Sequence, residues 1–164
     1  MTGEVVVVGL GNGYRKDDGV GIVAAAALDE LGLPSVHVVT SVVEPTGLLE
    51  AWSGARLAVV IDAAVATPSA PGRVRRCHLG DVLAAPGGLS SHGIDIGRTH
   101  ELGQVLGRLP DALVVFTIEV ADTSWGIGLT PEVAAAVPEV VDMVATELNR
   151  YSAPARQSRR PASP

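Results

Sequence analysis

The sequence predicts a three-layer α/β/α sandwich, with helices on both faces of a mostly parallel, twisted sheet of about five strands. Uninterrupted apolar runs at residues 5–8 (VVVV) and 57–61 (LAVVI) are typical of strands that are buried on both faces. Helical patterns alternate with these runs along the chain, and the connections between them are short. This alternation favours a parallel sheet over an antiparallel one.

The 164 residues suit one domain with a sizeable core, which we place at residues 1–151. Residues 152–164 (SAPARQSRRPASP) are rich in Pro, Ser, Ala and Arg and contain nothing to bury. We expect this segment to be a disordered tail.

Charge and cysteine content restrict the possible partners and location. The chain has 18 acidic and 12 basic residues, a formal net charge of -6, which argues against a nucleic-acid partner. Cys77 is the only cysteine, which fits a reducing compartment. No apolar run approaches the roughly 20 residues of a membrane-spanning helix, and the N-terminus does not resemble a signal peptide. We therefore expect a cytoplasmic protein with no membrane partner.

The first half of the chain supplies three strands. The strand at residues 5–8 is followed by a glycine-rich loop, two adjacent aspartates and a helix whose apolar positions run from 20 to 31. A second strand is expected at residues 36–43, and a short helix then runs to Trp52 with Thr46 as its cap. The third strand, 57–61, delivers Asp62 at its C-terminal end.

The second half supplies the remaining strands and two helices. Residues 73–79 (RVRRCHL) are polar and mixed, which suits an edge strand, expected to be antiparallel. A helix is expected at 94–109 and a strand at 113–120. Thr130-Pro131-Glu132 then begins a last amphipathic helix, with a capping hydroxyl and proline at the first helical position.

Ligands of such folds bind beyond the C-terminal ends of the strands, and carboxylates gather there in this sequence. Asp18 opens the first helix and Asp62 ends the third strand, so both should lie at the same edge of the sheet. His92 follows in a loop rich in glycine and serine. Two carboxylates and one imidazole are suitable ligands for a divalent transition metal. Glu44 and Glu119 also end strands and are further candidates for this edge.

Each of these residues has an alternative, structural interpretation. An aspartate before a helix is most often its N-cap, and two in a row indicate that one caps the helix while the other has a different role. Asp62 at a strand end can accept backbone amides of the next loop, and His92 can be an ordinary surface histidine. A nucleotide-binding loop is disfavoured, because Tyr14 stands where GxGxxG requires its third glycine. The two aspartates would also cancel the attraction of a helix N-terminus for phosphate.

Four motifs occur in order: GLGNGYRKDDGVG, VVIDAA, SSHG and GLTPEV. Together they resemble the nickel–iron hydrogenase maturation endopeptidases, over about residues 3–149. The resemblance implies an α/β/α sandwich that removes a C-terminal extension from the precursor of a hydrogenase large subunit after nickel has been inserted. It also implies that the nickel is carried by the substrate and that no organic cofactor is needed.

The resemblance assigns roles to individual residues. It makes Asp18, Asp62 and His92 the metal-contacting set, although the better-known members carry a glutamate where this chain has Asp18. Asp17, the neighbouring acid of the motif, is the candidate helix cap. Asp18 or Asp62 is the candidate general base of an aspartyl-type peptidase, and the residues do not choose between them. Gly11 and Asn12 are candidates for positioning the substrate. The alternative hypothesis is a non-enzymatic metal- or nucleotide-binding α/β module on the same scaffold.

Overall fold

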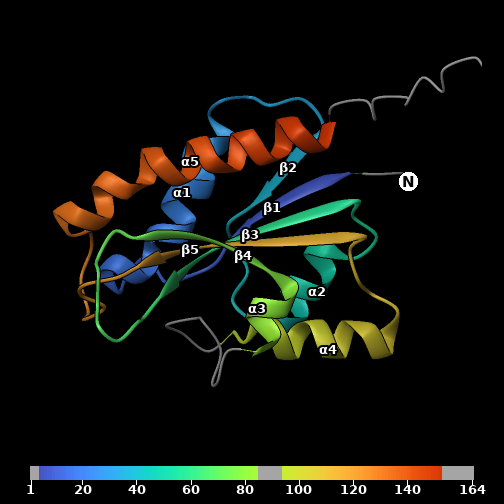
Figure 1. The fold of residues 1–164 in the computed structure, drawn as a ribbon, viewed down its shortest axis with the longest axis horizontal. Coiled ribbons are helices and arrows are strands. Elements are labelled where there is room, and N and C mark those ends of the chain that lie inside the picture. Colours follow the sequence, from blue (N-terminus) through green and yellow to red (C-terminus); the bar gives the residue numbers. More distant parts are fainter. Residues whose placement is uncertain (1–3, 85–93, 153–164) are drawn as a thin grey trace, which may run out of the picture.

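The computed structural model describes residues 4–84 and 94–152. Helices and strands alternate along most of this part of the chain (Figure 1). In order, the elements are β1 (Val5–Gly9), the short 3-10 helix η1 (Lys16–Gly19), α1 (Val20–Asp29), β2 (Val36–Val39), α2 (Pro45–Trp52), β3 (Leu57–Ala64), β4 (Val74–His78), α3 (Leu79–Ala84), α4 (Ile96–Leu106), β5 (Ala112–Glu119) and α5 (Pro131–Ser152).

The described strands form one five-stranded sheet in the order β2-β1-β3-β5-β4. Strand β1 pairs in parallel with β2 and β3, and β3 pairs in parallel with β5. Strand β4 lies at one edge and pairs with β5 in antiparallel fashion. The predicted mostly parallel sheet with one antiparallel edge strand is confirmed.

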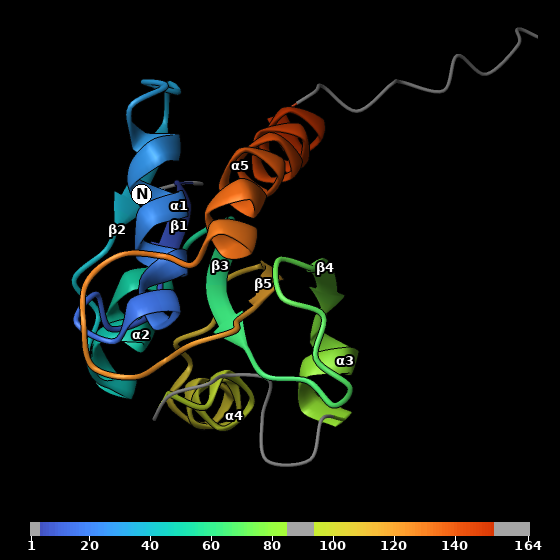
Figure 2. The ribbon, with the colours of Figure 1, turned by 90° about the vertical axis from the view of Figure 1, so that its left-hand side faces the viewer.

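Helices cover both faces of this sheet. Helices α1 and α5 pack on one face, and α2, α3 and α4 lie on the other (Figures 1 and 2). Alternate residues of the central strands enter the two apolar clusters. Val59 and Ile61, for example, belong to the cluster under α1 and α5, whereas Ala58 and Val60 belong to the opposite cluster. Both faces of β3 are therefore buried, as its continuous apolar run predicts.

Two predicted boundaries in the first half of the chain are wrong. Strand β2 ends at Val39 rather than at residue 43, and Val43 is largely exposed. Helix α2 begins at Pro45 with Glu44 at the N-cap position, so Thr46 lies inside the helix and does not cap it. Proline is favoured at the first helical position because its missing N–H has no partner there in any case.

The helices of the second half also differ from the prediction. Helix α3 begins at Leu79, where only an edge strand is expected from the sequence. Helix α4 is shorter than predicted. Asp95 caps it by accepting the backbone N–H of Arg98 at 3.1 Å, and Gly107 ends it in a left-handed conformation. Helix α5 extends to Ser152, the first residue of the predicted tail, and residues 153–164 lie outside the described part.

No helix in the described part of the chain has the length and apolar character needed to cross a membrane.

Candidate functional site

The loops that follow β1, β3 and β5 lie at the same edge of the sheet, because these three strands are parallel. Backbone contacts bring the loop after β1 close to its neighbours. The N–H of Leu10 donates to the carbonyl of Ile61 at 2.9 Å, directly before Asp62. Farther along the same loop, Arg15 forms a parallel bridge with Gly126 of the loop after β5. The candidate site is built at this edge.

Two glycines allow the close packing of this edge. Gly11 has a φ of +142°, and a Cβ atom there would lie 2.0 Å from the carbonyl oxygen of Asp18. A Cβ atom at Gly21 would lie 2.4 Å from the carbonyl oxygens of Leu10 and Ile61. Side chains at either position would separate the loop, η1 and β3, so these glycines hold the two predicted acidic residues near one another.

Asp18 lies in η1, two residues before the start of α1, and it is fully buried. Its Oδ2 atom accepts the backbone N–H of Asn12 at 3.1 Å. The glycine-rich loop therefore already directs one of its amides to a carboxylate of its own chain. This contact argues against a phosphate at the same amide and thus against the nucleotide-binding alternative.

Asp62 lies within β3, not after it, because the strand continues to Ala64. It is also buried, and its Oδ1 atom accepts the backbone N–H of Ala63 at 2.9 Å. By the alternation of β3, its side chain is on the same face as those of Ala58 and Val60, which is the face covered by α2 and α4. Thr117, its register partner in β5, is buried beside it.

His92, the third predicted metal ligand, lies outside the described residues. The described chain resumes at Ile94, which is buried in the cluster on the Asp62 face of the sheet. Residues 4–84 and 94–152 contain no group of three or more His, Cys, Asp or Glu side chains able to hold a metal ion. The structure therefore places two of the three predicted ligands at one edge and leaves the third as a prediction.

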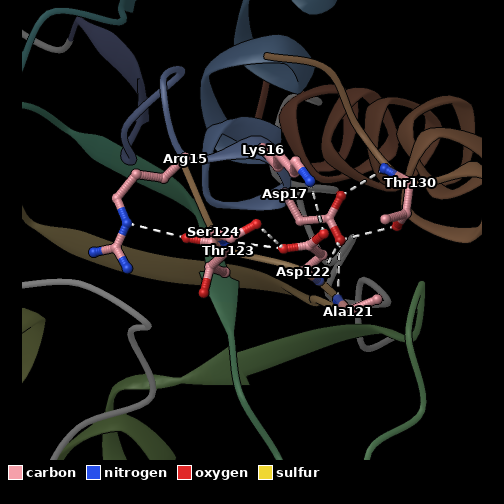
Figure 3. A network of polar contacts seen from close by, with 8 residues as sticks. All are labelled: Arg15, Lys16, Asp17, Ala121, Asp122, Thr123, Ser124 and Thr130. Atoms are coloured by element: carbon pink, nitrogen blue, oxygen red, sulfur yellow. Dashed lines mark hydrogen bonds and ion pairs between the residues drawn. The ribbon is translucent and has the colours of Figure 1, made fainter. Parts of the chain in front are cut away.

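Asp17 has a different role from the one predicted. Its side chain is fully buried but makes no capping hydrogen bond to η1 or α1. Instead it binds the segment between β5 and α5 (Figure 3). Oδ2 accepts the N–H groups of Ala121 and Asp122 at 3.0 and 2.9 Å and the hydroxyl of Thr130 at 2.9 Å. Oδ1 accepts the N–H of Thr130 at 2.7 Å.

These contacts lower the pKa of Asp17. Burial raises it, because a charged carboxylate loses hydration, but the hydrogen bonds from Thr130, Asp122 and Ala121 together outweigh that effect. The carboxylate thus remains ionised in a fully buried position. Its function is to join η1 to the segment that leads into α5.

Neighbouring residues extend this junction (Figure 3). Lys16 Nζ lies 3.0 Å from Asp122 Oδ2, and Arg15 Nε donates to the carbonyl of Thr123 at 3.1 Å. Ser124 donates to Asp122 Oδ1 from its backbone and its hydroxyl. Sequence reasoning missed this network. The one sequence signal near it is GLTPEV, which contains Thr130, but this motif predicts a helix start and the family resemblance and gives no partner for Asp17.

Glu119 is a further buried acid, at the end of β5. It forms an ion pair with Arg73, whose Nε lies 3.5 Å from Oε2, and neither carboxylate oxygen has a hydrogen-bond partner within the described residues. In register it is two residues beyond Thr117, the partner of Asp62. Glu44, the other predicted strand-end acid, is exposed at the start of α2.

A cleft of about 530 Å³ borders the glycine-rich loop. Its walls come from that loop, from α1, from the segment between β2 and α2 with the first residue of α2, and from the residue at which the described chain resumes. The lining residues are Gly11, Asn12, Gly13, Tyr14, Ile22, Thr40, Val42, Val43, Pro45 and Ile94. Gly11 and Asn12, the predicted substrate-positioning residues, are among them. The site thus combines two buried carboxylates with a cleft whose wall includes Asn12, the residue that donates its N–H to Asp18.

Comparison with known proteins agrees with this architecture. Residues 28–147 match the family model HycI, described as hydrogenase maturation protease. No curated protein matches the chain. Among solved structures, the hydrogenase maturating endopeptidase HybD from E. coli has a TM-score of 0.79 and 20% identity, covering 91% of this chain and 94% of that one.

Two proteins from Thermococcus kodakarensis are similar as well. The [NiFe] hydrogenase maturation protease HybD has a TM-score of 0.73 and 26% identity, covering 88% of this chain and 98% of that one. The maturation protease HycI has a TM-score of 0.64 and 20% identity, with 89% and 92% covered. These likenesses show that the chain shares the fold of these proteins.

Proposed function

Because the chain belongs to the hydrogenase maturation protease family, we propose that this endopeptidase removes the C-terminal extension of a nickel–iron hydrogenase large-subunit precursor. The proposed reaction follows nickel insertion, and the enzyme recognises the nickel that the substrate carries. The observation that supports this most directly is that Asp18 and Asp62 belong to neighbouring segments at the same edge of the sheet, and that Asp18 accepts the N–H of Asn12, which lines the cleft. Both aspartates are buried, and the Leu10–Ile61 backbone hydrogen bond joins the segments that carry them.

The donor set suits a metal that arrives with the substrate. Two carboxylates supply oxygen ligands, and His92 would add an imidazole nitrogen, which together leave other coordination positions of nickel to the substrate. A partial set of this kind recognises nickel without holding it permanently. Aspartate at position 18 is one methylene shorter than glutamate, so its carboxylate would either approach the metal differently or hold it less firmly.

The proposed cleavage requires one proton acceptor at this edge. Water attacks the carbonyl carbon of the scissile peptide, and either Asp18 or Asp62 accepts the proton that this water loses. The C–N bond then breaks, and the departing amine takes up a proton. The adjoining cleft holds the substrate segment, with Gly11 and Asn12 along one wall.

The test is processing of a purified precursor in nickel-loaded and nickel-free forms. We expect mass spectrometry to show loss of the C-terminal peptide only from the nickel-loaded form. Absence of cleavage in both forms would contradict the proposed substrate. Equal cleavage of both would retain the protease but overturn recognition of nickel.

A further inference from the structure

Three large apolar side chains are exposed on two loops that adjoin the candidate site. Tyr14 belongs to the loop after β1 and is 70% exposed, whereas Trp125 and Ile127 belong to the loop after β5 and are 76% and 83% exposed. We name these three residues the aromatic platform. They include two of the five aromatic residues of a chain in which aromatic residues are rare.

The two loops that carry the platform are hydrogen-bonded to one another. The N–H of Gly126, between Trp125 and Ile127, donates to the carbonyl of Tyr14 at 2.9 Å. The N–H of Lys16 donates in turn to the carbonyl of Gly126 at 3.1 Å. Tyr14 is therefore close in space to Trp125 and Ile127, although more than one hundred positions separate it from them in the sequence.

Side-chain contacts also restrict the platform. The Arg15 guanidinium lies over the ring of Trp125, 5.6 Å from its centroid, and Arg15 Nε donates to Thr123. Asp17 anchors the start and the end of the loop after β5 through Ala121, Asp122 and Thr130. An exposed tryptophan on a loop held in this way loses little conformational freedom on binding, which favours affinity.

We propose that the aromatic platform is a docking surface for the folded body of the large-subunit precursor, separate from the carboxylates that act on its extension. This inference rests on the proposed function for the identity of the partner. Continuity with the candidate site supports it, because Tyr14 also lines the cleft and Asp17, beside Asp18, anchors the second loop. When a segment of the precursor occupies the cleft, the adjoining surface of the precursor lies over the platform.

The chemistry of the platform specifies the kind of surface it fits. Tryptophan, tyrosine and arginine are the residues that most often dominate binding energy at protein interfaces. Trp125 and Ile127 require an apolar patch on the precursor, and the Arg15 guanidinium at its border favours a carboxylate there. The partner is thus a protein surface with an apolar centre and an acidic border.

The test measures binding of nickel-free precursor, which the proposed reaction leaves intact. Trp125→Ala and Ile127→Ala should each raise the Kd by about tenfold or more. With nickel-loaded precursor, both should raise KM and leave kcat within about twofold, because they do not touch the carboxylates. Val105→Ala is the matched control. Val105 is 84% exposed on α4, close to the other edge of the sheet, and its variant should bind like wild type.

Unchanged Kd in both platform variants would overturn the inference, whether or not the precursor is cleaved. A wild-type chain that binds but never cleaves would contradict the proposed function alone, since the comparison of Kd values remains valid. Analytical sedimentation of the chain alone tests whether a second copy of the chain, and not the precursor, binds to the platform. If Trp125→Ala abolishes self-association and leaves the Kd for precursor unchanged, the docking proposal is wrong.

Discussion

Asp17 and Asp18 are adjacent, both buried, and engaged in different ways. Asp17 accepts four hydrogen bonds from the segment between β5 and α5. Asp18 accepts the N–H of Asn12, in the loop that borders the cleft. One carboxylate thus joins two parts of the scaffold, and the other faces the loop at which we place the substrate.

This difference shows that burial of a carboxylate does not by itself identify its role. A buried charge is costly unless partners compensate for it. At Asp17 the compensation comes from donors of the scaffold, so the benefit is stability and position. Asp18 accepts an N–H from Asn12, a residue of the cleft wall, and it lies at the same edge of the sheet as a second acid, Asp62. Removal of each aspartate should therefore affect a different property.

The largest effect is expected for Asp18→Asn. The asparagine oxygen can retain the hydrogen bond from Asn12, but the negative charge and the proton acceptor are lost. Processing of nickel-loaded precursor should fall by about 10²- to 10⁴-fold, which is the usual contribution of a general base to the rate. A cleavage time course measures this, and thermal unfolding should show a Tm close to that of wild type.

An exposed aspartate provides the control for this prediction. Asp142→Asn changes an exposed aspartate on α5 and should leave processing unaffected. If Asp18→Asn processes the precursor at the wild-type rate, the reactive carboxylate lies elsewhere. A large loss of stability would instead make Asp18 a scaffold residue like Asp17.

The next effect is a loss of stability in Asp17→Asn. An amide has one acceptor oxygen, and its NH₂ group would face the N–H groups of Ala121, Asp122 or Thr130. We expect the free energy of unfolding to fall by about 3 kcal/mol or more, since hydrogen bonds to a charged group contribute about 1.5–3 kcal/mol each. Urea denaturation measures this.

Thr130→Val tests whether the loss comes from the individual hydrogen bonds. This variant removes only the hydroxyl donor, while the backbone N–H of residue 130 still donates to Oδ1 of Asp17. The free energy of unfolding should therefore fall by less than in Asp17→Asn. Equal stability of Asp17→Asn and wild type would show that this junction does not support the fold.

The fold could be predicted from the sequence because its signals are local. Four valines in a row and the LAVVI run identify strands that are buried on both faces, and these became β1 and β3. Parallel strands end at one edge, so Asp18 and Asp62 could be placed together without any knowledge of packing. Some boundaries could not be predicted in this way. Strand β2 ends four residues early, where the chain turns away toward Pro45.

The role of Asp17 could not be predicted, because its partners lie 104 to 113 positions away in the sequence. Local reasoning assigns an aspartate before a helix to the N-cap, and only the tertiary arrangement shows the donors of the loop after β5. The aromatic platform could not be predicted for the same reason, since Tyr14 and Trp125 become neighbours through backbone hydrogen bonds between loops that are distant in the sequence. His92 remains a prediction from the SSHG motif.

The smallest effect separates Asp17 from the other carboxylates by its dependence on pH. Its pKa is lowered in the folded chain, because hydrogen bonds to the ionised form outweigh the opposing effect of burial. A group with a lowered pKa contributes stability above its unfolded pKa, here about 3.8, and that contribution is lost as the pH falls through the folded value. The difference in unfolding free energy between wild type and Asp17→Asn should therefore be constant from pH 7 to about 5 and shrink below about pH 4. Urea denaturation of both proteins across this range measures the difference, in which carboxylates common to both proteins largely cancel. A difference that stays constant down to pH 2.5 would mean that the asparagine variant loses stability through packing, and that the charge of Asp17 does not hold the junction together.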